Sequence, residues 1–279
     1  MTKITAAEVN KLRKQTGLGM MDCKKALVEA EGDFDKAIEI LRKKGQKVAA
    51  KRGDRDANQG LVIAKTNGDG NKGIIVVVNC ETDFVAKNNE FVDFANSIAD
   101  VALNSSANNV DELKSTSYDG NGTSVGEALT DQIAKTGEKV DVSDFSVVEA
   151  ATVVAYNHPG NQVASVVGLN QEGEGAGSAG KDVAMQAAAM APVAVDENGV
   201  AKEVIDKEME IGREQAREEG KPENILDKIA QGKVKKFLKE NTLLNQAFIK
   251  DNKQSVAQYL KGVDNDLTVT DFKRYALGQ

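Results

Sequence analysis

The sequence predicts an α+β protein: a small bundle of three helices, then two α+β subdomains in tandem, the second carrying a projecting antiparallel helical hairpin. Three observations lead to this prediction. Helix-start signals and apolar residues at helical spacing fill residues 5–41. The middle of the chain twice shows the order strand, turn, strand, loop, helix. A Gly-Lys-Pro break at 220–222 separates two long amphipathic segments.

These patterns divide the chain into four parts. We expect a helical bundle at 1–45, a linker at 46–60, a first α+β subdomain at 61–145, and a second at 146–279 that includes the hairpin at about 201–243.

Composition limits the classes of function. Acidic residues outnumber basic ones by 43 to 36, and only 4% of residues are aromatic, which argues against a phosphate-binding or base-stacking surface. No stretch is long and uncharged enough to cross a bilayer, and the first residues lack a signal core. Cys23 and Cys80 form no metal-binding pair. We therefore expect a cytoplasmic protein with a protein partner, no nucleic acid and no membrane.

The N-terminal helices are marked by their caps. Thr5 and Glu8 have the spacing of a capping box, and Asp33 can cap the third helix. The resulting bundle resembles the ubiquitin-associated fold. Residues 46–60 carry basic side chains but no large apolar face, so we interpret them as a solvated tether.

The two subdomains are predicted from apolar strands and the turns between them. We expect strands at 61–66, 72–80, 147–156, 162–169 and 267–277, and helices at 125–133, 183–190 and 255–260.

The segment 74–91 joins a buried strand to the start of a helix. Thr82 can cap this helix, and Asp83 in its first turn suits the helix dipole. We expect the same helix to continue through residue 101. The ring of Phe84 is then either a core anchor or a side chain aimed outward, and composition and spacing alone favour the core.

Two candidate enzyme motifs fail on their chemistry. Residues 175–182 nearly form a phosphate-binding loop, but Asp182 stands where that loop needs Ser or Thr for magnesium. We interpret it as a flexible loop ending in a helix cap. His158 is the only histidine, so a Ser-His-Asp hydrolase would have to use it, although it lies in an expected turn. We expect no catalytic residue, no metal site and no cofactor.

Two motifs of the chain resemble the bacterial elongation factor Ts family. Residues 12–27 read L-R-K-Q-T-G-L-G-M-M-D-C-K-K-A-L, and residues 79–88 read N-C-E-T-D-F-V-A-K-N. The segments K-P-E-N-I-L and G-K-V-K-K-F at 221–226 and 232–237 agree with this resemblance. It implies a guanine-nucleotide exchange factor in translation elongation. Such a factor binds the GTPase elongation factor Tu in its GDP and nucleotide-free forms and promotes GDP release by disturbing the partner's magnesium site.

The resemblance also implies which residues meet the partner. Thr82, Asp83, Phe84 and Val85 would form the segment that dislocates magnesium from the partner, with Phe84 as a wedge between partner side chains. The other implied contacts are Arg13, Met20, Met21 and Lys24 toward the nucleotide-binding domain, and His158, Ile249 and Lys250 toward another domain.

Other classes of function stay open at this point. A ubiquitin-associated-like bundle on a tether could be an adaptor that binds a protein without altering nucleotide release. A hydrolase that depends on His158 is the third class. Self-association is also compatible with the sequence.

Overall fold

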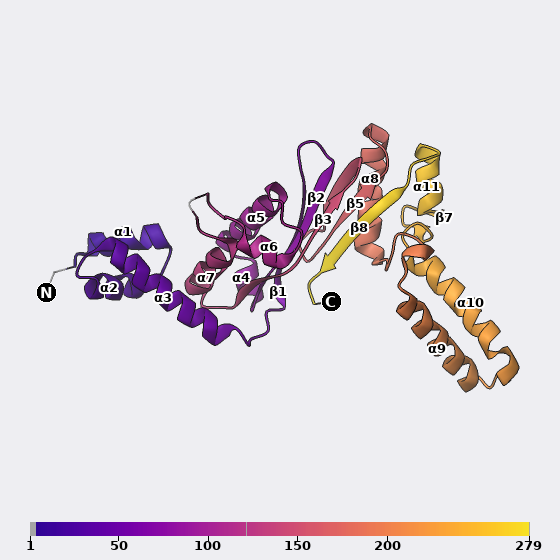
Figure 1. Ribbon diagram of the computed structural model, residues 1–279, viewed down its shortest axis with the longest axis horizontal. Coiled ribbons are helices and arrows are strands. Elements are labelled where there is room, and N and C mark those ends of the chain that lie inside the picture. The colour runs from indigo at the N-terminus through magenta and orange to yellow at the C-terminus, as the bar shows by residue number, and fades with distance from the viewer. Residues whose placement is uncertain (1–3, 121, 279) are drawn as a thin grey trace. The chain divides into compact units, whose positions relative to one another are not determined.

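The computed structural model describes residues 4–120 and 122–278 (Figure 1). Its helices are α1 (Ala6–Thr16), α2 (Met20–Glu29), α3 (Phe34–Arg52), α4 (Asp83–Ala86), α5 (Asn89–Asn104), α6 (Val110–Ser115), α7 (Val125–Thr136), α8 (Glu174–Met190), α9 (Lys202–Glu218), α10 (Glu223–Asn241), α11 (Val256–Val263) and the 3-10 turn η1 (Glu197–Gly199). Its strands are β1 (Gln59–Thr66), β2 (Lys72–Cys80), β3 (Val140–Glu149), β4 (Thr152–Asn157), β5 (Val163–Leu169), β6 (Ala247–Phe248), β7 (Asp251–Ser255) and β8 (Val269–Ala276).

The mixture of helices and small sheets confirms the α+β class. The strand orders are β1-β2-β3, β4-β5-β8 and β6-β7. The described chain divides into two compact units: the first contains residues 4–63, 76–145 and 277–278, and the second contains residues 64–75 and 146–276.

The N-terminal helices begin where their caps predict. The Thr5 side chain accepts from the amide of Glu8, and the Glu8 carboxylate accepts from the Thr5 amide at 2.7 Å, so the capping box is confirmed. Asp33 caps α3 as expected. Apolar side chains of α1, α2 and α3, including the fully buried Leu12 and Leu27, form a core of their own.

Helix α3 continues to Arg52, so the predicted linker at 46–60 is wrong over its first seven residues. Lysine and alanine are good helix formers, and no proline interrupts this stretch. Gly45 also lies against α7, where a Cβ atom would come within 3.0 Å of the Ala134 side chain. Helix α3 therefore also packs against α7, a contact that the sequence does not reveal.

The predicted strand at 147–156 is divided between two sheets. Its first part belongs to β3, which lies next to β2, and its second part is β4, which pairs with β5. The chain bends at residues 150–151, where the amides of Ala150 and Val153 donate to the carbonyls of Asn71 and Gly70. These hydrogen bonds divide the predicted continuous strand and direct the chain from the sheet of β3 into the sheet of β4.

Two helices differ from the prediction in the first unit. The helix expected after Thr82 ends at Ala86, and a separate helix α5 begins after Asn88, whose side chain caps it. Helix α6 lies outside every helix expected from the sequence, although Asn109 and Glu112 carry a cap signal there.

In the second unit, α8 packs on the antiparallel sheet β4-β5-β8 (Figure 1). The helix begins at Glu174, nine residues earlier than expected, so the predicted flexible loop at 175–182 is wrong. Small side chains let this helix approach the sheet closely. At Gly180 a Cβ atom would lie 2.7 Å from the Val154 side chain and 3.0 Å from the Leu169 side chain. Gly180, which belongs to the segment that resembles a phosphate loop, therefore serves helix packing.

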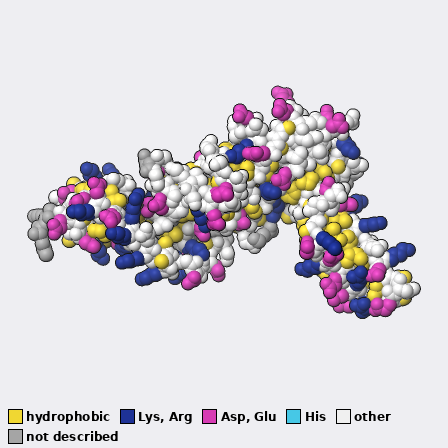
Figure 2. All heavy atoms as spheres, in the orientation of Figure 1, with side chains coloured by type: hydrophobic (Ala, Val, Ile, Leu, Met, Phe, Trp, Pro, Cys, Tyr) yellow, Lys and Arg dark blue, Asp and Glu magenta, His cyan; other side chains and the backbone are white. Residues whose placement is uncertain are grey.

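Helices α9 and α10 pack on each other as the predicted hairpin. The reversal lies at residues 219–222, with Gly220 at a positive φ of 74°. Figure 2 shows basic and acidic side chains intermixed over the hairpin, and ion pairs such as Arg213–Asp227 at 2.6 Å cross between the helices. Exposed pairs of this kind each contribute about 1 kcal/mol or less.

We predict that Gly180→Ala and Gly177→Ala change stability in opposite directions. The first substitution places a methyl group against Val154 and Leu169 and should lower the free energy of unfolding by about 1 to 3 kcal/mol. The second lies on the same helix with no atom within 4 Å of the added Cβ. It should raise the free energy of unfolding by about 0.5 to 1 kcal/mol. Urea denaturation measures both, and equal effects would contradict the close contact.

Candidate functional site

The segment Thr82–Val85 forms a single capped turn at the end of β2. Thr82 has extended backbone angles, and its hydroxyl accepts from the amide of Val85 at 3.4 Å. The carbonyl of Thr82 accepts from the amide of Ala86 at 3.2 Å. The strand before this turn is buried at Cys80. The turn is thus joined directly to the interior of the first unit.

Phe84 points outward from this turn, with 83% of its surface exposed. Residues two apart on a helix lie on roughly opposite sides, and Ala86, two positions on, is buried. The expectation from composition that Phe84 is a core anchor is therefore wrong. A large exposed ring on a capped turn is a group that can enter a partner's surface.

Asp83 lies beside Phe84 and forms an ion pair with Lys87, Oδ2 to Nζ, at 2.6 Å. The hydrogen bond from Lys87, with its charge, lowers the pKa of Asp83. Because both side chains are at least half exposed, the pair contributes little to stability. A partner group could replace Lys87 at small energetic expense.

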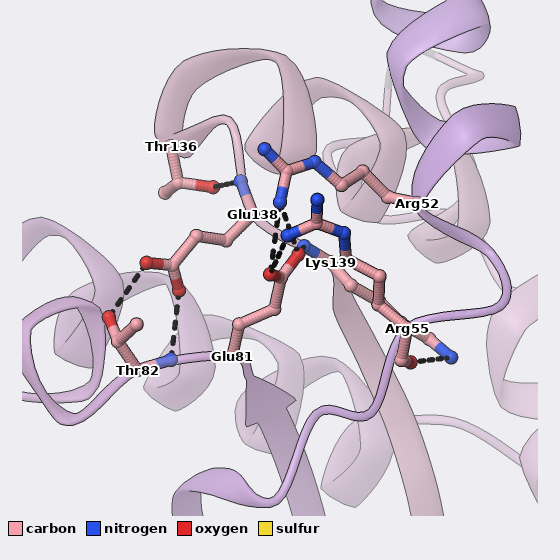
Figure 3. Close-up of polar contacts among 7 residues, drawn as sticks. All are labelled: Arg52, Arg55, Glu81, Thr82, Thr136, Glu138 and Lys139. Carbon is pink, nitrogen blue, oxygen red and sulfur yellow. Dashed lines mark hydrogen bonds and ion pairs between the residues drawn. The ribbon is translucent and has the colours of Figure 1, made fainter.

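A carboxylate from the segment before β3 holds Thr82 (Figure 3). Glu138 precedes β3, and its Oε1 accepts from the Thr82 hydroxyl at 2.7 Å. Its Oε2 accepts from the Thr82 amide at 3.0 Å. The amide of Glu138 in turn donates to the hydroxyl of Thr136 at the end of α7. Both donors of the cap residue are thereby satisfied by one side chain.

Glu81, the residue before Thr82, is the centre of a second set of contacts (Figure 3). Arg52 donates to both of its oxygens at 3.0 Å, and Arg55 donates to Oε2 at 3.1 Å. The amide of Lys139 donates to Oε1 at 2.6 Å. Only 13% of the Glu81 side chain is exposed, so these charge-assisted bonds are partly shielded from water.

Burial and charge shift the pKa values of two adjacent groups. Burial alone would raise the pKa of Glu81, but the Lys139 amide and the two arginines outweigh it and lower that pKa. Burial, helped by the charge of Glu138, raises the pKa of the Cys80 thiol to about 12. Glu81 is therefore ionised and Cys80 protonated at neutral pH.

The implied N-terminal contacts lie on exposed surface. Met20 is 50% exposed and Met21 61% exposed, so neither side chain fills the core. Lys24 lies one turn further along α2, on the same side as both methionines. Arg13, near the end of α1, is also exposed. Met20, Met21 and Lys24 thus form one apolar and basic surface.

The remaining candidates lie in the second unit. His158 is exposed in the turn after β4, and its Nδ1 lies 3.1 Å from the Tyr156 hydroxyl. Within the described residues its ring has no hydrogen bond to a carboxylate, as a catalytic triad would need. Ile249 is 45% exposed. Lys250 is exposed but forms an ion pair with Asp182 at 2.6 Å.

The described residues offer neither a metal site nor a membrane-spanning helix. No group of His, Cys, Asp and Glu side chains there could hold a metal ion. No helix there combines the length and the apolar composition needed to span a membrane.

Sequence reasoning missed the residues that support the turn. Arg52 and Arg55 lie in the stretch that the sequence predicts as a solvated tether, but both bind Glu81. Glu138 and Lys139 stand far from Thr82 in the chain, and no local pattern marks them. The one available signal was the position of Glu81 inside the motif at 79–88.

Comparisons with known proteins agree with one another. The family model described as Elongation factor TS matches residues 81–279. The chain is 59% identical over 278 residues to Elongation factor Ts of Christiangramia forsetii, with 100% of both chains covered. It is 50% identical to Elongation factor Ts of Flavobacterium psychrophilum, again with 100% of both covered. It is also 50% identical to Elongation factor Ts of Amoebophilus asiaticus, with 99% of each covered.

We predict that Phe84→Ala leaves stability almost unchanged. Exposed side chains away from packing contacts change the free energy of unfolding by less than about 0.5 kcal/mol. Phe91→Ala is the matched control, because that ring is 1% exposed, and it should lose about 3 to 5 kcal/mol. Urea denaturation compares the two variants. A loss in Phe84→Ala close to that of the control would mean that the ring is packed.

We predict that Glu81 contributes to the acid sensitivity of the fold. Its pKa is lower in the folded protein than its ordinary value of 4.5. Its stabilisation is thus fully present above that value and is lost as the pH falls through the folded pKa. Glu81→Gln should lose about 2 kcal/mol at neutral pH.

Thermal melts between about pH 7 and pH 3 test this prediction. The Tm of Glu81→Gln should fall less steeply with acid than the Tm of the unsubstituted protein. Glu149→Gln, at an exposed glutamate, is the control and should keep the full slope. Parallel curves for Glu81→Gln and the unsubstituted protein would contradict the assignment.

Proposed function

The chain belongs to the elongation factor Ts family, and we propose that it is a guanine-nucleotide exchange factor for elongation factor Tu in translation elongation. The observation that carries the proposal is Phe84, a large ring that is 83% exposed on a capped turn. The chain binds the partner in its GDP form and in its nucleotide-free form.

Exchange of this kind follows from linkage. A factor that binds the nucleotide-free partner more tightly than the GDP form must weaken GDP binding by the same factor. Bound GDP depends on magnesium, whose near-octahedral shell tolerates little displacement. In our proposal Thr82, Asp83, Phe84 and Val85 push on the elements around that shell. In this proposal the magnesium belongs to the partner, and this chain need not bind it.

The side chains of the turn at 82–85 have different roles in the proposed release of GDP. Phe84 supplies apolar volume that can separate partner side chains. Asp83 offers a carboxylate to a polar partner group once Lys87 is displaced. Val85 is half-buried beside them, and Thr82 caps the turn. The work is done by binding energy, so no residue acts as a chemical catalyst.

Other exposed groups would supply affinity. We assign Met20, Met21, Lys24 and Arg13 to the nucleotide-binding domain of the partner, since an apolar and basic surface suits a protein interface. The N-terminal helices would form a ubiquitin-associated-like bundle.

We assign the exposed groups of the second unit to another domain of the partner. These are His158, Ile249 and Lys250. The ion pair of Lys250 with Asp182 restrains that side chain before binding. We place the protein in the cytoplasm, without nucleic acid or membrane, and self-association is compatible with the proposal.

The test is release of a fluorescent GDP analogue from elongation factor Tu, followed by stopped flow at increasing concentrations of this protein. Acceleration should saturate with the unsubstituted protein. The double variant Asp83→Ala/Phe84→Ala should reduce the maximal acceleration by about tenfold or more, as loss of an interface hot spot does.

A matched control is available on the hairpin. Ile225→Ala/Asp227→Ala removes an exposed apolar residue and an aspartate in a surface ion pair, the same two features as the test variant. It should keep the full acceleration. Binding by the unsubstituted protein without acceleration would support an adaptor and refute exchange.

A further inference from the structure

Glu81 and Glu138 bind each other's neighbours in a reciprocal arrangement (Figure 3). The Glu81 carboxylate accepts from the amide of Lys139, the residue after Glu138. The Glu138 carboxylate accepts from the amide of Thr82, the residue after Glu81. The end of β2 and the segment before β3 are therefore joined by two carboxylate-to-amide bonds, one in each direction.

The turn that carries Phe84 needs such support. Helix α4 has four residues, and one helical turn is unstable in isolation because nucleation fixes many dihedral angles for few hydrogen bonds. Its own cap bond, from the Val85 amide to the Thr82 hydroxyl, is long at 3.4 Å. The two bonds from Thr82 to Glu138 are shorter, at 2.7 and 3.0 Å, and involve a charged acceptor.

Glu138 is itself held from two directions. Its amide donates to Thr136 at the end of α7. The next residue, Lys139, donates its amide to Glu81 and its Nζ to the carbonyls of Gly53 and Arg55 at 2.8 and 2.9 Å. These contacts fix the segment that carries the Glu138 carboxylate.

We propose that Glu138 is a positioning residue for exchange, which orients Asp83 and Phe84 by holding both donors of Thr82. The inference rests on the proposed function. Glu138 acts through Thr82 and need not touch the partner. Its loss leaves the exposed surfaces of α1, α2 and the second unit in place, so the maximal rate of GDP release suffers and partner binding is largely kept.

Three variants test whether the two acceptor oxygens of Glu138 are needed. Glu138→Ala removes both acceptors. Glu138→Gln keeps one acceptor oxygen for the Thr82 amide and offers an amide group that can donate to the Thr82 hydroxyl. Glu149→Ala removes an exposed glutamate at the far end of β3 and serves as the control.

The measurement is the stopped-flow release of fluorescent GDP as a function of factor concentration. Glu138→Ala should lower the maximal release rate about tenfold, with a change of less than about twofold in the half-saturating concentration. Glu138→Gln should stay within about threefold of the unsubstituted protein. Glu149→Ala should match it.

A double-mutant cycle tests the route through Thr82. Thr82→Val removes the hydroxyl and keeps the shape of the side chain. Combined with Glu138→Ala, it should lower the rate no further than Glu138→Ala alone, because both changes break one contact set. Additive losses in the release rate would show that Glu138 does not act through the Thr82 hydroxyl.

Amide hydrogen exchange gives a readout that does not depend on nucleotide-exchange activity. In the free protein, Glu138→Ala should speed exchange at the amides of Thr82 and Val85 about tenfold or more, while Glu149→Ala leaves both amides unchanged. Unchanged protection in Glu138→Ala would overturn the positioning role.

The two hypotheses fail in different ways. Full activity of Glu138→Ala, together with inactivity of Asp83→Ala/Phe84→Ala, would refute the positioning role and keep the exchange function. No acceleration by the unsubstituted protein would refute the exchange function, and hydrogen exchange would then decide alone whether Glu138 orders the turn. A large fall in Tm for Glu138→Ala would overturn a local positioning role in favour of a global structural one.

Discussion

The first unit depends on the contacts between the Glu81 carboxylate and its three donors, Arg52, Arg55 and the Lys139 amide. They bring the end of α3, the end of β2 and the segment before β3 to one carboxylate. An ion pair of this kind is worth more than the many exposed pairs of the chain because it is partly shielded and has several donors. A carboxylate that accepts from two arginines and an amide also tolerates little change in direction. The strand end therefore leaves the sheet along a fixed path into the turn at 82–85.

The fold divides into features that are local in sequence and features that are not. Thr5, Asp33 and Ser255 cap helices through bonds to residues three positions away, so their helix starts can be predicted from the sequence. The boundaries that failed depend on distant partners. Helix α3 packs against α7 beside Ala134, and α8 lies close to the sheet at Gly180. Neither neighbour is visible in a short sequence window.

The candidate site divides in the same way. The cap at Thr82 follows from its residue type and from the strand before it. The direction of Phe84 did not follow, because an aromatic residue beside a buried strand is ordinarily packed, and composition favours that outcome. The structure shows an exposed ring because the buried side of this turn is already taken by Ala86. The support from Glu138 lies 56 positions along the chain from Thr82, beyond any pattern of helix or strand.

The two cysteines make this protein well suited to site-specific labelling. Cys23 and Cys80 are both free and buried. Burial also raises the pKa of Cys80 to about 12, so almost none of it is thiolate at neutral pH, and the thiolate is the form that attacks maleimides and iodoacetamides. A single cysteine introduced on the exposed surface would then react far faster than either native thiol. Fluorophores or spin labels could be attached there while the native sequence is otherwise kept.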